Sequence, residues 1–285
     1  MVAEMITIFS CPKAMVGYIG TIQKNAILSW KKNIPDCNII LFGNEEGVAD
    51  FSREWNIRNV DVVGTNEFGT PMLDSMFNRV QTISPSDYFC YVNSDIIICG
   101  GFLETLDLVS SKFDRFLIVG RRYDVDPGNY KHTVNLLETL VKPGEIMQLP
   151  VGSWFQIDYF IYKKGDFLDF PPFAIGRPVW DNWMIKHARK DMHIPVIDAS
   201  STIVAVHQKH DYNHVPQARG NSWDGPEGDR NRDLAGGDPF CILNANFISD
   251  GDALRRAYIQ NSRYYLWIFR CRLSRLLYHM KRIIP

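Results

Sequence analysis

Residues 87–98, DYFCYVNSDIII, form a run of strand-forming residues that three polar side chains interrupt. Asn93, Ser94 and Asp95 stand where a buried strand would normally carry apolar residues. A buried carboxylate without a partner costs considerable free energy, so Asp95 requires a cation or a hydrogen-bond donor nearby. The run therefore predicts either a polar turn that bends the strand or a ligand position at a strand end, and both interpretations stay open from the residues alone.

Strand and helix patterns alternate on both sides of this run. The expected strands are residues 5–11, 37–43, 60–64, 87–98, 116–125, 154–165 and 202–210, and the expected helices are residues 20–33, 45–57, 71–83 and 180–191. This alternation predicts an α/β fold with a mostly parallel central sheet and helices on both faces. In open sheets of this kind, ligands bind beyond the carboxyl ends of the strands.

Polar residues follow several of the expected strands, and we expect them to converge on one rim of the sheet. These residues are Ser10, Glu45, Asp95, Arg121, Arg122 and His207. His207 and His210 belong to the segment HQKHDYNH, which contains three histidines in eight residues. Such a density favours metal ligands, although a lone histidine is more often a structural residue.

The charge of the 285-residue chain is distributed unevenly, although its formal net charge is only −1. Residues 251–285 contain eight Arg or Lys and one Asp, whereas residues 1–250 contain the other 23 basic side chains and 31 acidic ones. The basic tail is therefore the place to expect an anionic partner. Nothing in the chain indicates nucleic-acid binding.

The tail at 251–285 is predicted to form an amphipathic helix, because its apolar residues are three, four or seven positions apart. They are Leu254, Tyr258, Tyr265, Phe269, Leu273, Leu276 and Met280. Three alternatives stay open for this helix: it packs on the body, it forms a homodimer, or it lies on an anionic membrane surface.

Cysteine usage and the absence of a long apolar run predict a cytoplasmic protein, with peripheral attachment at the inner face of the membrane left open. The six cysteines form no C-x-x-C pair, which favours reduced thiols over disulfides or a zinc site. No signal peptide is apparent at the N-terminus, and no run approaches the ~20 apolar residues of a spanning helix.

The segment YVNSDII resembles the D-x-D segment of GT-A glycosyltransferases, with Asn93 in place of the first Asp. The opening strand, the helix TIQKNAILSW and the segment GTPMLDSMFNRVQ are similar to the corresponding parts of these enzymes, so the resemblance covers residues 4–210. It implies a nucleotide-diphospho-sugar transferase fold over residues 1–250, with a nucleotide-binding half at about 1–100 and an acceptor half at about 101–250.

The resemblance also implies an activity. The enzyme would move a sugar from a nucleotide-diphospho-sugar donor to a hydroxyl of a glycan or lipid-linked acceptor, in cell-surface polysaccharide or glycolipid synthesis. Mn²⁺ or Mg²⁺ would be the cofactor, held by Asp95, His207 and His210. A sugar nucleotidyltransferase and a non-catalytic nucleotide- or sugar-binding protein remain as alternatives, the latter because Asn93 contributes no charge.

The remaining site residues follow from the same resemblance. The expected contacts to the nucleotide-sugar come from Phe9, Ser10, Glu45, Asp74, Arg79, Asn93, Ser94, Trp180 and Arg230. Asp181 is the first candidate for the general base, since it begins a helix between Trp180 and Trp183; the alternative is an N-cap aspartate beside two core tryptophans. Asp158 is the second candidate, with a structural role in a strand as its alternative.

Residues 211–239 form a polar stretch that is too long for an ordinary connection, so we expect either a functional lid or a disordered segment. Arg230 and Arg232 in this stretch would close over a diphosphate if it is a lid. The alternative is a solvated loop.

Overall fold

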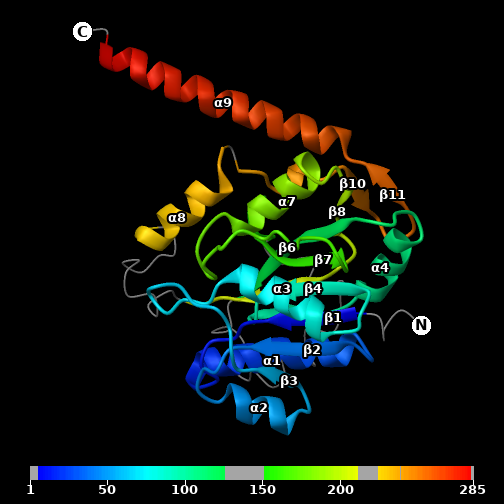
Figure 1. Cartoon of the computed structure of the whole chain (residues 1–285). Coiled ribbons are helices and arrows are strands. Elements are labelled where there is room, and N and C mark those ends of the chain that lie inside the picture. Colours follow the sequence, from blue (N-terminus) through cyan, green and yellow to red (C-terminus); the bar gives the residue numbers. More distant parts are fainter. Residues whose placement is uncertain (1–5, 126–150, 211–223, 238, 284–285) are drawn as a thin grey trace.

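The computed structural model describes residues 6–125, 151–210, 224–237 and 239–283, and its centre is a large twisted sheet (Figure 1). The first half of the chain supplies four parallel strands in the order β3-β2-β1-β4. They are β1 (Ile6–Ser10), β2 (Asn38–Phe42), β3 (Arg58–Val60) and β4 (Tyr88–Val92). The predicted α/β architecture with a parallel sheet is confirmed over this half.

The second half extends the same sheet in a mixed pattern. Strand β7 (Ile157–Lys163) is antiparallel to both β4 and β6 (Leu117–Val125). Strands β8 (Val196–Asp198) and β10 (Phe247–Ser249) continue it in parallel, and β11 (Leu254–Arg256) closes the edge antiparallel to β10. A short pair lies off this path, in which β5 (Ile96–Ile98) is antiparallel to β9 (Ala205–Gln208), and β9 also runs beside the end of β6.

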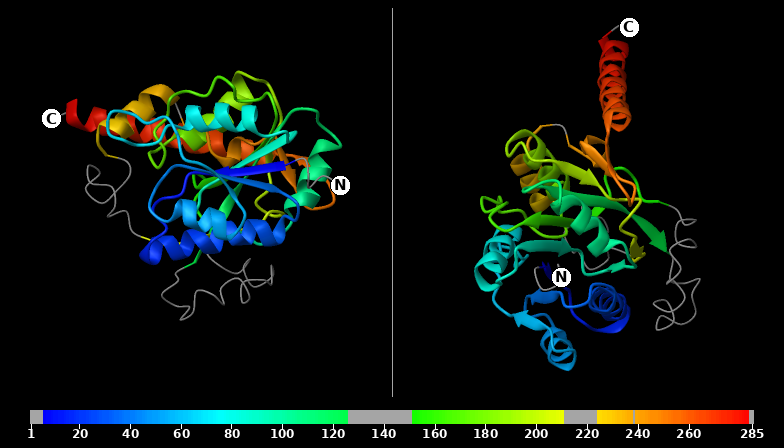
Figure 2. Two further views of the ribbon diagram at one scale, coloured as in Figure 1. Left: turned by 60° about the horizontal axis from the view of Figure 1, so that its bottom comes forward. Right: turned by 90° about the vertical axis from the view of Figure 1, so that its right-hand side faces the viewer.

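Helices cover both faces of the sheet (Figures 1 and 2). One core is built with side chains of α1 (Gly17–Asn33), α2 (Val48–Glu54) and α4 (Phe102–Ser110). The other core is built with side chains of α3 (Leu73–Ile83) and α7 (Trp180–Lys190), and α9 (Tyr258–Ile283) adds Tyr264 to it. The apolar spacing of the sequence explains this, because Ile22, Ala26 and Trp30 of α1 are all buried.

The single strand expected up to residue 98 is two strands, β4 and β5, separated by a turn at residues 93–95, and two further predicted elements differ from the structure. The third strand ends at Val60, where its pairing partner β2 ends at Phe42, and Val62 beyond it is 79% exposed, so the expected strand at 60–64 is wrong. The expected helix at 251–285 begins only at Tyr258. The residues before it form β11, whose backbone hydrogen-bonding groups pair with β10 instead of entering a helix.

Candidate active site

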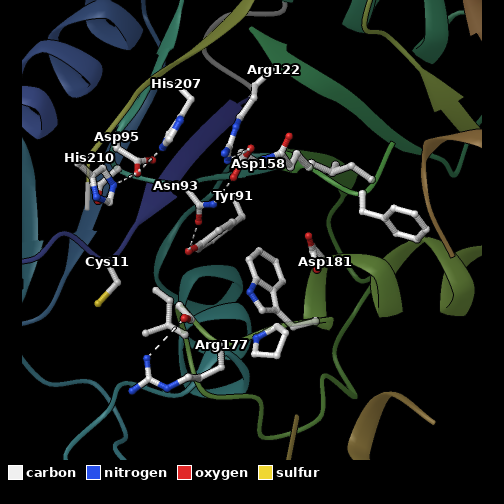
Figure 3. Close-up of a pocket in the computed structure, with 18 of the residues that line it drawn as sticks. Cys11, Tyr91, Asn93, Asp95, Arg122, Asp158, Arg177, Asp181, His207 and His210 are labelled. Atoms are coloured by element: carbon white, nitrogen blue, oxygen red, sulfur yellow. Dashed lines mark hydrogen bonds and ion pairs between the residues drawn. The ribbon is translucent and has the colours of Figure 1, made fainter. Parts of the chain in front are cut away.

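The polar trio that interrupts the apolar run forms the turn between β4 and β5. The Ile96 N–H donates to the Asn93 carbonyl at 3.0 Å, and the Asn93 N–H donates to the Asp158 carbonyl of β7 at 3.0 Å. The turn lines a cavity of about 370 Å³ at the carboxyl ends of β1 and β4 (Figure 3). The bend and the ligand position are therefore compatible interpretations, because the bend brings Asp95 to the cavity.

Asp95, His207 and His210 form a cluster whose ligand atoms all lie within 4.8 Å of one another. Asp95 Oδ2 is 2.9 Å from His210 Nε2 and 3.6 Å from His207 Nε2. Strand register accounts for this proximity, because Ile96 of β5 pairs with His207 of β9, next to Asp95. Two segments more than a hundred residues apart in sequence thus supply one group of ligands.

His207 is oriented from behind by Asp124 of β6. Its Nδ1 lies 3.1 Å from Asp124 Oδ1, and the register of β6 and β9 places the two residues opposite each other. With Nδ1 engaged in this way, Nε2 faces Asp95 and the cavity. This carboxylate–histidine arrangement is the one that commonly fixes the tautomer of a metal-binding histidine.

The electrostatics of the cluster favour an ionised Asp95 next to a protonated His207. Burial alone would raise the pKa of Asp95, but hydrogen bonds from His207 and His210 hold it well below its ordinary value. Burial likewise opposes protonation of His207, yet the hydrogen bonds to Asp124 and Asp95 raise its pKa to about 9. A divalent cation bound here would take the place of the proton on His207.

The donor set fits a divalent metal ion. Asp95 Oδ1 is buried and has no hydrogen-bond partner among the described residues, so one oxygen of the cluster is available for a ligand. One carboxylate and two imidazoles suit Mn²⁺ and later transition metals better than Mg²⁺, which prefers oxygen ligands. Asp95, His207 and His210, all predicted from the sequence, are brought together here.

Asp181 lies on the other side of the cavity from this cluster, in the first turn of α7 (Figure 3). Burial raises its pKa to about 7; the Asn182 backbone N–H opposes the shift, and Asp158 adds to it. The N-cap residue of α7 is Val179, which has a φ of 69°, so Asp181 is not the N-cap that the alternative interpretation required. A carboxyl group with a pKa near neutrality is suited to general base catalysis.

Asp158 lines the same cavity but is fully engaged by the protein. Its Oδ1 accepts a hydrogen bond from Asn93 Nδ2 at 2.7 Å, and its Oδ2 accepts one from Arg122 Nη1 at 2.8 Å. The Asn93 amide oxygen in turn accepts from the Tyr91 hydroxyl at 3.1 Å. These bonds give Asp158 the structural role that was its alternative, and they occupy both ends of the Asn93 side chain.

Ser94 and Trp180 also line the cavity. The Ser94 hydroxyl donates to Gln23 Oε1 at 2.9 Å, which ties the turn to α1. The Trp180 ring meets Tyr91 edge-on, with ring centroids 5.2 Å apart, and forms part of the wall. Trp183 does not line this cavity, because its ring stacks on His187 at 4.5 Å.

A second cavity of about 640 Å³ adjoins the first, and the two share Cys11, Lys13, Ile175, Gly176 and Arg177. Glu45, predicted from the sequence, lines this second cavity, as does Asp61. The two cations, Lys13 and Arg177, therefore lie where the cavities meet. Lys13 is exposed, but partial desolvation by the surrounding protein lowers its pKa, and the charge of Asp95 opposes that shift.

Lys13 and Arg177 were missed in the sequence analysis. Lys13 follows β1 by three residues, so the rule that polar residues after strands line the site would have found it. Arg177 had no comparable signal, because it lies in a loop before α7 and is placed by Glu227 of α8 (Pro226–Ala235). Glu227 Oε2 accepts a hydrogen bond from Arg177 Nε at 3.0 Å and is itself buried.

Phe9 and Ser10 lie outside both cavities, because β1 is still inside the sheet at these positions. Phe9 is fully buried, with its ring centroid 5.1 Å from that of Phe77, and the Ser10 hydroxyl donates to the Val92 carbonyl at 2.6 Å. The chain reaches the cavity one residue later, at Cys11.

Asp74, Arg79 and Arg230 line two further hollows beside α3, which adjoin the larger cavity, and none of the three residues lines either of the two cavities described above. Arg79 is exposed, whereas Asp74 is half-buried, with its Oδ1 buried and without a hydrogen-bond partner among the described residues. Arg230 Nη1 lies 3.3 Å from Glu67 Oε2 on the surface. Residues 211–223 of the lid candidate lie outside the described residues, and Arg232 pairs with Asp229 on its own helix.

Comparisons with known proteins show a likeness in fold. No family model and no curated protein matches the chain. The structure of S. aureus TarS 1–349 in complex with UDP-GlcNAc is 11% identical in sequence to this chain, with a TM-score of 0.48. The alignment covers 73% of this chain and 60% of the TarS chain. The structure of glucosyl-3-phosphoglycerate synthase from Mycobacterium tuberculosis with Mg²⁺ and UDP is 13% identical in sequence, with a TM-score of 0.42. That alignment covers 75% of this chain and 74% of the synthase chain. The chain thus spans about three fifths of the TarS fragment.

Proposed function

We propose that this protein is a metal-dependent glycosyltransferase that moves a sugar from a nucleotide-diphospho-sugar to an acceptor hydroxyl. One observation carries the proposal: a carboxyl group with a pKa of about 7, Asp181, lies across a single cavity from a cluster of side chains that could hold a metal ion. The cavity is large enough for a sugar ring. A base and a cation site on opposite sides of one cavity are what sugar transfer from a diphosphate requires.

The two connected cavities suggest how the donor would lie. Its diphosphate would bridge the Asp95–His207–His210 cluster and the two cations Lys13 and Arg177, since phosphate oxygens require cationic partners. The nucleoside would then occupy the larger cavity, which Glu45 lines. The sugar would extend into the smaller cavity, toward Trp180 and Asp181.

The reaction requires a proton acceptor on the acceptor side and charge stabilisation on the donor side. Asp181 would take the proton of the attacking hydroxyl as the new glycosidic bond forms, which would invert the anomeric configuration. A metal bound by Asp95, His207 and His210 would stabilise the negative charge of the leaving diphosphate. Lys13 and Arg177 would add to this by holding the same phosphates.

The alternatives from the sequence analysis have less support. A sugar nucleotidyltransferase uses a phosphate oxygen as its nucleophile, and that oxygen is already deprotonated, so a base such as Asp181 would have no task. A non-catalytic binding protein would gain nothing from a desolvated carboxyl group with a raised pKa, since desolvating it costs stability. The expected place in polysaccharide or glycolipid synthesis stays a prediction.

The test separates donor binding from chemistry. Thermal shift assays with UDP, GDP, CMP and their sugars, with and without Mn²⁺, would first identify the donor, and donor hydrolysis and transfer would then be measured. We expect Asp95→Ala to lose the Mn²⁺-dependent shift. Asp181→Asn should keep that shift and lose turnover.

The exposed carboxylate of Asp169 offers a matched control, so Asp169→Asn should change neither binding nor turnover. The proposal fails if no nucleotide sugar is bound. It also fails if Asp181→Asn turns over the donor as fast as the wild type.

A further inference from the structure

Helix α9 has two apolar faces, and only one of them packs on the body. The inner face carries Tyr264, which is buried, and Trp267 and Ile268, which pack against the same core. Asn261 strengthens this attachment by donating a hydrogen bond to the Ala245 carbonyl at 2.8 Å. An amphipathic helix on a globular body needs one apolar face, so the second face requires another explanation.

The outer face lies on the opposite side of α9 and is a continuous stripe of large apolar side chains. Their exposed fractions range from 43% to 75%. The members of the stripe are Tyr258, Ile259, Tyr265, Leu266, Phe269 and Leu273. At 3.6 residues per turn these positions fall on one arc of the helix, over about four turns. A contiguous exposed apolar patch of this kind usually marks an interaction surface.

We propose that this outer face of α9 docks on an anionic lipid bilayer, with the helix lying flat in the headgroup region. Arg263 and Arg270 are exposed on the helix surface next to one edge of the stripe. Neither forms an ion pair with any described residue. Residues 258–283 contain six Arg or Lys and no Asp or Glu. Aromatic and aliphatic side chains beside basic ones are the pattern of a helix that lies in a membrane interface.

A second copy of the chain fits the outer face less well. If two α9 helices met through this stripe, their basic side chains would come together without any acidic residue of either helix to compensate. An anionic bilayer complements the same charges. No helix in the part of the chain that the structure describes is long and apolar enough to cross a membrane, so the contact would be made at the surface.

The position of α9 permits such a contact. The described part of the body lies on one side of the helix, and the C-terminal end of α9 projects beyond it (Figures 1 and 2). The helix also reaches the cavity wall, because its Trp267 packs on Phe155, a residue that lines the smaller cavity, with ring centroids 5.3 Å apart. If the proposed glycosyl transfer is correct, docking would hold that cavity close to acceptors carried by lipids.

Vesicle co-sedimentation tests the proposal with the full chain and without any donor. We expect binding to vesicles of equimolar phosphatidylcholine and phosphatidylglycerol, little binding to phosphatidylcholine alone, and release by high salt. Leu266→Ser should lower the partition coefficient about tenfold, since a large apolar side chain leaves the membrane. The double variant Arg263→Gln with Arg270→Gln should lower it about 30-fold, from roughly 1 kcal/mol per basic residue.

Leu168 supplies a matched control, because Leu168 and Leu266 are both 51% exposed and Leu168 lies outside α9. Leu168→Ser should bind vesicles like the wild type, and both serine variants should keep the wild-type far-UV spectrum and melting temperature. Equal partitioning of Leu266→Ser and the wild type would overturn the proposal. So would a shift of Leu266→Ser from dimer to monomer in light scattering with unchanged vesicle binding, because the stripe would then be a dimer interface.

This experiment is independent of the proposed catalysis. Absence of vesicle binding by the wild type, with normal nucleotide binding, would refute the docking surface alone. Normal vesicle binding without any nucleotide binding would refute the glycosyltransferase alone.

Discussion

Asp124 provides the sharpest test of how the candidate metal site is built. Its Oδ1 lies 3.1 Å from His207 Nδ1, and its side chain is largely buried, with 17% exposed. Asp124→Asn keeps the shape of the side chain but removes its charge. An amide nitrogen in the place of Oδ1 would donate to His207 Nδ1, so the ring proton would lie on Nε2, the nitrogen that faces the candidate metal site. A hydrogen bond to a charged group contributes about 1.5–3 kcal/mol. Since about 1.4 kcal/mol corresponds to a tenfold change, we expect Mn²⁺ affinity to fall about 10- to 100-fold.

Mn²⁺ binding should be measured directly, by calorimetry or by the loss of the free Mn²⁺ electron paramagnetic resonance signal. Asp114→Asn is the matched control, because Asp114 is an 83% exposed carboxylate that pairs with Lys163 on the surface. The melting temperature of Asp124→Asn without metal shows whether the fold is intact. An unchanged Mn²⁺ affinity in a folded Asp124→Asn would refute the inference that Asp124 orients His207.

The remaining predictions concern Asp181 and Lys13. Asp181 must be deprotonated to act as the base, so donor turnover should rise with pH through about 7 and then level off. If the residual activity of Asp181→Asn showed the same rise with pH, the ionisation would belong to another group. Because the pKa of Asp181 is raised on folding, its own contribution to the stability of the wild type falls as pH rises from about 4 to about 7, so Asp181→Asn should melt higher than the wild type at pH 8 and similarly at pH 4. Lys13→Gln should weaken binding of the nucleotide diphosphate about tenfold, whereas the exposed Lys112→Gln should not; equal affinities would place the diphosphate elsewhere.

The structure also shows why some predicted contacts lie outside the cavities. Phe9 and Ser10 are at the end of β1, but that strand is still enclosed between its neighbours there, and the chain emerges only at Cys11. Asp74 and Arg79 lie on α3, beside hollows that adjoin the larger cavity, and neither residue lines that cavity itself. The position of a residue after a predicted strand indicates which edge of the sheet it approaches. Whether its side chain reaches a cavity depends on where that strand leaves the sheet.

The amino-acid sequence was sufficient to predict most of the strands and helices and three residues of the candidate metal site. Alternating patterns predicted the parallel half of the sheet, because local propensity and apolar periodicity decide helix and strand over short distances. The interrupted run at 87–98 predicted either a polar turn or a ligand position at Asp95, because a buried carboxylate needs a partner. The resemblance to GT-A glycosyltransferases then implied Asp95, His207 and His210 as metal ligands.

How these groups are arranged around the cavity depends on the packing of the folded chain. The register of β5 against β9 places His207 next to Asp95, and the register of β6 against β9 places Asp124 behind His207. Burial of the first turn of α7 raises the pKa of Asp181 to about 7, and Glu227 of α8 places Arg177 where the cavities meet. These effects depend on distance and solvent exclusion between segments far apart in sequence, which spacing along one chain does not encode.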